Sequence, residues 1–115
     1  MLLLCISLTG MKEEDGMKVD FLKNGTTLTV KPDGRLDTAT SPELERLMQP
    51  EMEGMTDIII DMEKVDYISS RGLRILLTVE QDMEDRGGSV KVIHVNPIIM
   101  EVFEMTGFLD LLTVE

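Results

Sequence analysis

The chain has 115 residues and a formal net charge of −11, with 22 acidic and 11 basic residues. This length is enough for one globular domain and too short for two. So acidic a surface repels the phosphates of nucleic acids and anionic membranes, and we therefore expect no nucleic-acid binding and no membrane insertion. Cys5 is the only cysteine, which rules out an intrachain disulfide and fits a reducing, cytoplasmic location.

The first 16 residues differ in character from the rest of the chain. Residues 1–10 are apolar. A signal peptide would require a basic residue before this apolar run, but the first basic residue is Lys12. The run is also too short to span a membrane. Residues 11–16 are charged and linker-like. We therefore expect an N-terminal extension or linker over residues 1–16, whose apolar half could also form an extra strand, and one domain over residues 17–115.

An opening β-hairpin is predicted by two segments with alternating side chains. Residues 18–22 and 27–31 alternate apolar and polar positions, at least in part, as half-buried strands do. Asn24-Gly25 between them is a strong signal for a tight hairpin turn. Pro32-Asp33-Gly34 carries turn chemistry, which predicts that the second strand ends there.

A helix and a buried strand are expected next. Ser41-Pro42 is a favourable pair for an N-cap and first helical residue, and Pro50 should end this helix. Residues 56–62 contain three consecutive isoleucines in a short run, which favours a central strand buried on both faces. Residues 63–68 are interpreted as a connection.

The second half of the chain alternates helix and strand. Ser69-Ser70 opens a helix whose apolar face lies between residues 72 and 86, and Gly87-Gly88 ends it. Residues 89–95 are expected to form a strand. Asn96-Pro97 starts a last helix that ends at Gly107, and the apolar residues 108–114 should pack back on the body.

This order of elements predicts the fold class. A hairpin followed by helix, strand, helix, strand and helix is typical of an α/β protein with a mixed sheet. We expect about four to five strands covered by three to four helices.

Most enzymatic chemistry is unsupported by the residues present. His94 is the only histidine, the serines lack a nucleophile elbow, and no glycine-rich stretch has the spacing of a phosphate-binding loop. One cysteine and one histidine exclude a thiolate or imidazole metal cluster. Asp61, Glu63 and Asp66 lie close in sequence, but a solvated loop is the favoured interpretation over a cation site. We therefore expect no enzyme activity, no cofactor and no metal.

The remaining feature is the pair Ser69-Ser70 at the start of a helix. A serine often caps a helix, and one serine is enough for that role. The other would present an exposed hydroxyl to a kinase. A phosphate there would be stabilised by the helix dipole and free N–H groups, and would add about −1.5 to −2 charges to one spot.

Five segments in order resemble the STAS family, and within it the bacterial anti-sigma factor antagonists. The segments are Gly34–Asp37, Ile58–Met62, Val65–Leu73 with its serine pair, Gly87–Ser89, and Asn96-Pro97 followed by Val102–Phe108. Together they cover almost the whole chain from Met17 to Val114. The resemblance implies a STAS-like (SpoIIAA-like) fold, in which a small sheet is packed on one side by helices.

The resemblance also implies a mechanism. The unphosphorylated antagonist binds an anti-sigma factor that is itself a serine kinase, and so frees the sigma factor; phosphorylation of the antagonist ends binding, and a serine phosphatase restores it. By position, Ser70 is the phosphorylated residue. The partner-binding residues implied by the resemblance are Asp37, Thr38, Ser69, Ser70, Arg71 and Arg74.

Two departures from the family pattern bear on this mechanism. Ser69 stands where such antagonists usually have Asp, and Arg71 stands where they often have Ser or Thr. These residues motivate a second hypothesis, a STAS interaction module in a signalling or transport complex that is not phosphorylated. A third hypothesis is a sensor that binds a nucleotide or lipid beside the helix start. The few aromatic residues and the acidic surface argue against this sensor.

Overall fold

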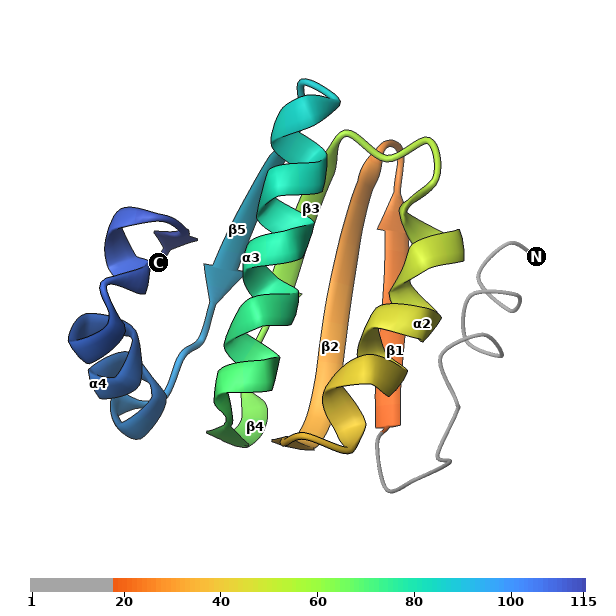
Figure 1. Ribbon diagram of the computed structural model, residues 1–115. Coiled ribbons are helices and arrows are strands. Elements are labelled where there is room, and N and C mark those ends of the chain that lie inside the picture. Colours follow the sequence, from red (N-terminus) through yellow and green to blue (C-terminus); the bar gives the residue numbers. More distant parts are fainter. Residues whose placement is uncertain (1–17) are drawn as a thin grey trace.

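The computed structural model describes residues 18–115, so the expected extension over residues 1–16 lies outside the described residues. Within these described residues six strands form one mixed sheet, and helices α2 and α3 lie side by side against one face of it (Figure 1). The strands are β1 (Lys18–Asn24), β2 (Thr27–Leu36), β3 (Asp57–Asp61), β4 (Lys64–Ile68), β5 (Ser89–Ile93) and β6 (Thr113–Val114). The helices are α2 (Thr40–Met52), α3 (Ser70–Asp85) and α4 (Pro97–Thr106), with a short 3-10 turn, η2 (Phe108–Asp110).

The strand order is β1-β2-β3-β5-β6, and β4 pairs with the end of β2. Among the strands of residues 18–115, only the β1–β2 pairing is antiparallel, and the other pairings are parallel. Helices α2 and α3 provide the crossovers between parallel strands. The prediction of a mixed sheet covered by helices is confirmed, with six strands rather than four to five.

The opening hairpin forms as predicted, with its turn one residue later than expected. Asn24 pairs with Thr27, so the two-residue loop is Gly25-Thr26. Gly25 has φ of 67°, a left-handed conformation that glycine adopts without steric cost.

The prediction that β2 ends at Pro32-Asp33-Gly34 is wrong, and so is the interpretation of residues 63–68 as a connection. Those residues contain strand β4, which lies alongside the end of β2 and lets it continue to Leu36. Pro32 lies between the segment of β2 that pairs with β3 and the segment that pairs with β4, so it interrupts neither parallel ladder. The register of the β2–β4 pairing shifts between Gly34 and Arg35, as at a β-bulge.

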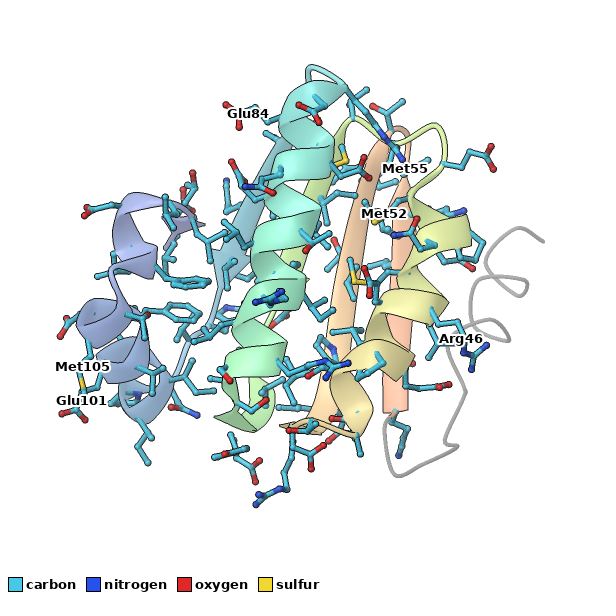
Figure 2. The ribbon with its side chains drawn as sticks, viewed as in Figure 1. Arg46, Met52, Met55, Glu84, Glu101 and Met105 are labelled. Atoms are coloured by element: carbon cyan, nitrogen blue, oxygen red, sulfur yellow. The ribbon has the colours of Figure 1, made fainter. Side chains whose placement is uncertain are left out.

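The predicted ends of helix α2 also need correction. The helix begins at Thr40, so Ser41 is not its N-cap, and it continues past Pro50 to Met52. Pro50 lies near the end of the helix, where its missing N–H removes little of the hydrogen-bond ladder. The Met52 side chain lies between α2 and the sheet and is nearly fully buried (Figure 2). This burial stabilises the last turn of α2.

The core lies between the helices and one face of the sheet. Phe21, Val30, Ile60 and Val92 form one row of buried side chains across the strands, because they are in register. The other face of the sheet is mostly polar, and Ile59 on it is only partly buried. The prediction that β3 is buried on both faces is therefore wrong: helices cover one face.

The caps of the later helices follow the sequence prediction. The Ser69 hydroxyl caps α3, and the Asn96 side chain caps α4 by accepting a hydrogen bond from the Ile99 N–H. Gly107 ends α4 in a left-handed conformation. The last residues pack back on the body as expected, since β6 pairs with β5 and Leu112 is buried.

Candidate functional site

Ser69 is fixed between β4 and α3. Its backbone N–H donates to the Leu36 carbonyl of β2 over 2.8 Å, and its hydroxyl accepts from the Gly72 N–H over 3.2 Å. The first contact ties the start of α3 to the end of β2, and the second satisfies one of the free N–H groups of the helix. Ser69 therefore has a structural role at the start of α3. Its role in partner binding, which the resemblance implies, stays a prediction.

Ser70 is the first residue of α3 and is exposed. Within residues 18–115 its hydroxyl has no hydrogen-bond partner. Because Ser69 already caps the helix, the Ser70 hydroxyl is not needed for the fold. It is available to solvent, at the helix end where a phosphate is favoured.

Asp37 lies in the β2–α2 loop, and its carboxylate is engaged within that loop. It accepts hydrogen bonds from the backbone N–H of Thr40 over 2.9 Å and of Ala39 over 3.0 Å. The Thr40 N–H holds the pKa of Asp37 below its ordinary value, helped by the Thr40 hydroxyl, the Ala39 N–H and the charge of Arg35, against an opposing effect of burial. The N-cap residue of α2 is Ala39, which has no capping side chain, so the N-cap role predicted for Ser41 is wrong. The Ser41 hydroxyl instead donates to the Asp37 carbonyl.

A groove between α2 and α3 brings several of the predicted residues together. Its lining residues, hereafter the Ser70 groove, are Thr38, Glu45, Ser70, Arg71, Arg74, Ile75 and Thr78. Four of the six residues implied by the resemblance therefore share one concave surface, and Asp37 and Ser69 do not line it. Glu45 on α2 was missed by sequence analysis, since nothing in the sequence indicated that it would face α3.

Arg35 and Tyr67 form a second arrangement at the same end of the sheet that sequence analysis missed. They are paired in the β2–β4 register, and the Arg35 guanidinium lies 4.5 Å from the centre of the Tyr67 ring. Such a cation–π contact at an exposed site is worth about 0.5–1 kcal/mol. It was not predictable because residues 63–68 were not recognised as a strand.

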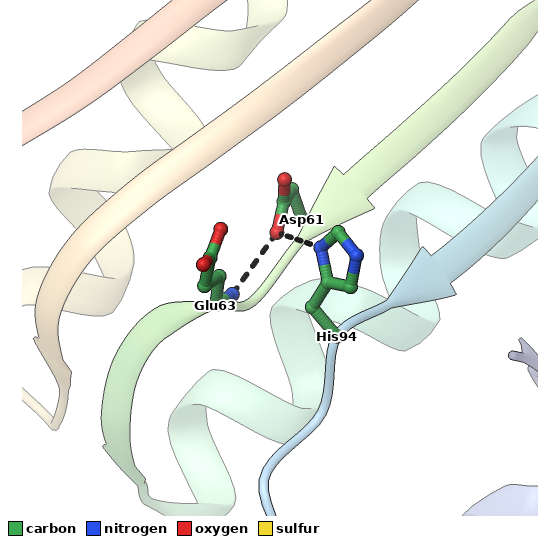
Figure 3. Close-up of side chains that lie close together, drawn as sticks. All are labelled: Asp61, Glu63 and His94. Atoms are coloured by element: carbon green, nitrogen blue, oxygen red, sulfur yellow. Dashed lines mark hydrogen bonds and ion pairs between the residues drawn. The ribbon is translucent and has the colours of Figure 1, made fainter.

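Asp61, Glu63 and His94 form a cluster on the open side of the sheet (Figure 3). Their donor atoms lie within 4.8 Å of one another, so the cluster has the spacing of a metal site, with His94 in place of the Asp66 considered from the sequence. Asp61 is nevertheless already occupied: its Oδ1 atom lies 2.9 Å from His94 Nδ1 and accepts a hydrogen bond of 3.0 Å from the Glu63 N–H. We interpret the cluster as a clasp that joins the ends of β3 and β5 to the turn before β4.

The clasp depends on an ionised Asp61 and an unusual backbone at His94. Burial opposes ionisation of Asp61, but the hydrogen bonds from His94 and the Glu63 amide, with the charge of Lys31 nearby, outweigh it and lower its pKa. His94 has φ of 59°, which ends β5 at Ile93 rather than at the predicted Val95. This conformation is uncommon outside glycine and turns the ring toward Asp61.

A family model described as the STAS domain matches residues 18–115. The chain belongs to the STAS domain family. Its relatives include BtrV of Bordetella bronchiseptica, 32% identical over 70% of this chain and 71% of the relative. The anti-sigma-B factor antagonist of Staphylococcus aureus is 34% identical over 74% of this chain and 80% of the relative. The predicted resemblance is confirmed: this STAS domain is a member of the anti-sigma factor antagonist family, whose proteins are non-enzymatic regulators.

Solved structures confirm the fold. The unphosphorylated form of the anti-sigma factor antagonist SpoIIAA matches with a TM-score of 0.67 at 16% identity, covering 86% of each chain. The phosphorylated form of the Bacillus protein matches with a TM-score of 0.66 at 17% identity, covering 86% of this chain and 90% of the other. Among residues 18–115 of this STAS domain, no helix is both long and apolar enough to cross a membrane.

Proposed function

We propose that this STAS domain binds a serine-kinase anti-sigma factor through the Ser70 groove, which frees the sigma factor, and that phosphorylation of Ser70 ends the binding. The kinase transfers the γ-phosphoryl group of ATP to the Ser70 oxygen, which loses its proton, and ADP leaves. A serine phosphatase hydrolyses the ester and returns the protein to its binding form. Because sigma factors act on RNA polymerase, the proposed location is the cytoplasm.

The observation that carries this proposal is the division of roles between two adjacent serines. Ser69 caps α3 and is held by the Leu36 carbonyl and the Gly72 N–H, whereas the Ser70 hydroxyl is exposed and makes no hydrogen bond among the described residues. A kinase can therefore modify Ser70 without breaking a contact of the fold. The match to relatives named anti-sigma factor antagonists supports the partner class.

The test is phosphorylation of three forms of the full chain by a serine-kinase anti-sigma factor from the same genome. Wild type and Ser69→Ala should each gain one phosphate on Ser70, and Ser70→Ala should gain none, as read by mass spectrometry of proteolytic fragments. Ser69→Ala is the matched control because it removes the neighbouring hydroxyl. Equal labelling of Ser70→Ala and wild type would show that the assigned site is wrong, and an unmodified wild type that binds the anti-sigma factor would favour the STAS interaction module without a switch.

A further inference from the structure

Two arginines beside Ser70 have no charged partner among the residues that the structure describes. Arg71 and Arg74 are exposed on α3, and among residues 18–115 neither makes an ion pair or a hydrogen bond. The other arginines of the chain each lie beside a carboxylate: Arg35 beside Asp37, Arg46 beside Glu43, and Arg86 beside Asp82.

Arginines without an ion-pair partner among the described residues are unexpected in a protein with this net negative charge. Acidic residues outnumber basic ones by 22 to 11, so carboxylates are available to pair with most cations. The start of α3 adds a partial positive charge beside Arg71 and Arg74, because its free N–H groups point out of the helix end. Glu45 on α2 is the one carboxylate side chain lining the groove, and no ion pair joins it to either arginine. The Ser70 groove therefore has a local excess of positive charge on an acidic protein.

We propose that the Ser70 groove receives a carboxylate-rich segment of the partner protein, and that Arg71 and Arg74 are its contact residues. A guanidinium presents several N–H donors in a planar fork that matches a carboxylate, which makes arginine suited to such contacts. The identity of the partner as an anti-sigma factor rests on the proposed function, but the charge argument does not depend on it. An acidic segment would be repelled by most of this surface and attracted here, so the charge pattern also selects the docking site.

This arrangement changes what a phosphate on Ser70 would do. Arg74 follows Ser70 by four residues, so the two side chains lie on the same face of α3. A phosphate carries about −1.5 to −2 charges and pairs strongly with guanidinium groups. It would therefore occupy Arg71 and Arg74 and cancel the positive charge that attracts the partner. In this account, phosphorylation ends binding by removing an attraction.

The first experiment uses an acidic probe and needs no knowledge of the partner. A synthetic peptide of 12 residues rich in Glu and Asp is titrated into the 15N-labelled full chain at low salt, where surface charges are least screened. Amide signals of Thr38 and of residues 70–74 should shift. In R71Q/R74Q these shifts should require about tenfold more peptide or vanish. Absence of shifts at these amides, or an equal response of R71Q/R74Q, would overturn the proposal.

A charge-matched variant controls for net charge. K91E and R71Q/R74Q each change the net charge by −2. Lys91, however, lies on β5, on the open side of the sheet. K91E should respond to the peptide within about threefold of wild type, with both variants checked for folding by circular dichroism. Equal weakening by K91E would mean that only the overall charge matters, which also contradicts the proposal.

Two further arms separate this inference from the proposed function and from other anions. Binding of the anti-sigma factor should weaken in R71Q/R74Q and become less dependent on salt; unchanged binding would defeat the arginine contacts and leave the proposed function standing. A response to the acidic peptide without binding of any anti-sigma factor would leave the acidic-partner surface standing and defeat the proposed function. Tighter binding of an oligothymidine or of phosphatidylserine vesicles than of the peptide would overturn the choice of a protein partner.

Discussion

Gly72 of α3 lies against the main-chain carbonyl of Leu36 at the end of β2. A Cβ atom at Gly72 would lie 3.0 Å from the Leu36 oxygen and 2.8 Å from Ile68 Cγ1. The helix start can approach the strand this closely only because residue 72 has no side chain. The same approach allows the Ser69 N–H to reach the Leu36 carbonyl, and so sets the position of Ser70.

Gly72→Ala should therefore destabilise the domain, although alanine is the better helix former. The added methyl group forces α3 away from β2, at a cost of about 1–3 kcal/mol, which outweighs the gain of about 1 kcal/mol in helix propensity. Urea unfolding measures the change. Gln81→Ala at an exposed position of the same helix should stay within about 0.5 kcal/mol of wild type, and equal stability of Gly72→Ala and wild type would contradict the close packing.

The two serines should differ in their effect on stability. Ser69→Ala removes the cap of α3 and should cost about 1 kcal/mol, whereas Ser69→Gly should cost only a few tenths. Ser70→Ala should stay within about 0.5 kcal/mol of wild type, because its hydroxyl holds nothing in the fold. Thermal unfolding of the three variants at one pH tests this difference, and a larger loss from Ser70→Ala than from Ser69→Ala would reverse the assigned roles.

Asp61→Asn should make stability less dependent on pH in the acid range. The folded-state pKa of Asp61 is lowered, so its ionised form stabilises the native state above the unfolded pKa, and this contribution is lost as the pH falls below about 4 toward the folded pKa. At pH 7 the substitution should cost about 1–3 kcal/mol, because it weakens two hydrogen bonds to a buried charge.

The matched control for Asp61→Asn is Glu63→Gln, since Glu63 joins the clasp through its backbone N–H and its side chain is exposed. Its unfolding free energy should follow that of wild type across the same pH series. A gap between wild type and Asp61→Asn that stays constant from pH 7 to pH 2.5 would contradict the role of the ionised carboxylate.

Glu80→Gln should have the opposite sign. Partial burial and the negative charge of Glu84 raise the pKa of Glu80. Glu84 lies in the last turn of α3, at its C-terminal end (Figure 2). A raised folded pKa means that ionisation opposes folding, so Glu80→Gln should stabilise by a few tenths of a kcal/mol near pH 7 and lose this advantage at and below about pH 4. Unfolding in urea at pH 7 and pH 4 measures both values, and destabilisation at pH 7 would refute the assignment.

Local signals were sufficient to predict the caps of α3 and α4, and contacts between distant residues explain what was missed. As caps, Asn96 and Gly107 act on their own helix, so the sequence nearby determines these two roles. Pro32, by contrast, remains in a strand because β4 lies alongside, and β4 comes about 30 residues later in the chain. The Asp61–His94 contact joins residues 33 positions apart, and the left-handed φ of His94 has no sequence signal.

The site follows the same pattern. The serine pair was located from a cap signal and a family resemblance, and the structure assigned the cap to Ser69. Thr38 and Arg74 were placed near Ser70 by the resemblance. Glu45 and the Arg35–Tyr67 contact were not foreseen, because they depend on how α2 packs on α3 and on the register between β2 and β4.

We propose that one phosphate on Ser70 decides whether this STAS domain binds a serine-kinase anti-sigma factor. The most direct measurement compares the affinity of the unphosphorylated chain and of the chain stoichiometrically phosphorylated on Ser70 for the same serine-kinase anti-sigma factor, by isothermal titration calorimetry with ADP present. We predict that phosphorylation weakens binding at least about tenfold, a difference of about 1.4 kcal/mol. Equal affinity of the two forms would contradict the account.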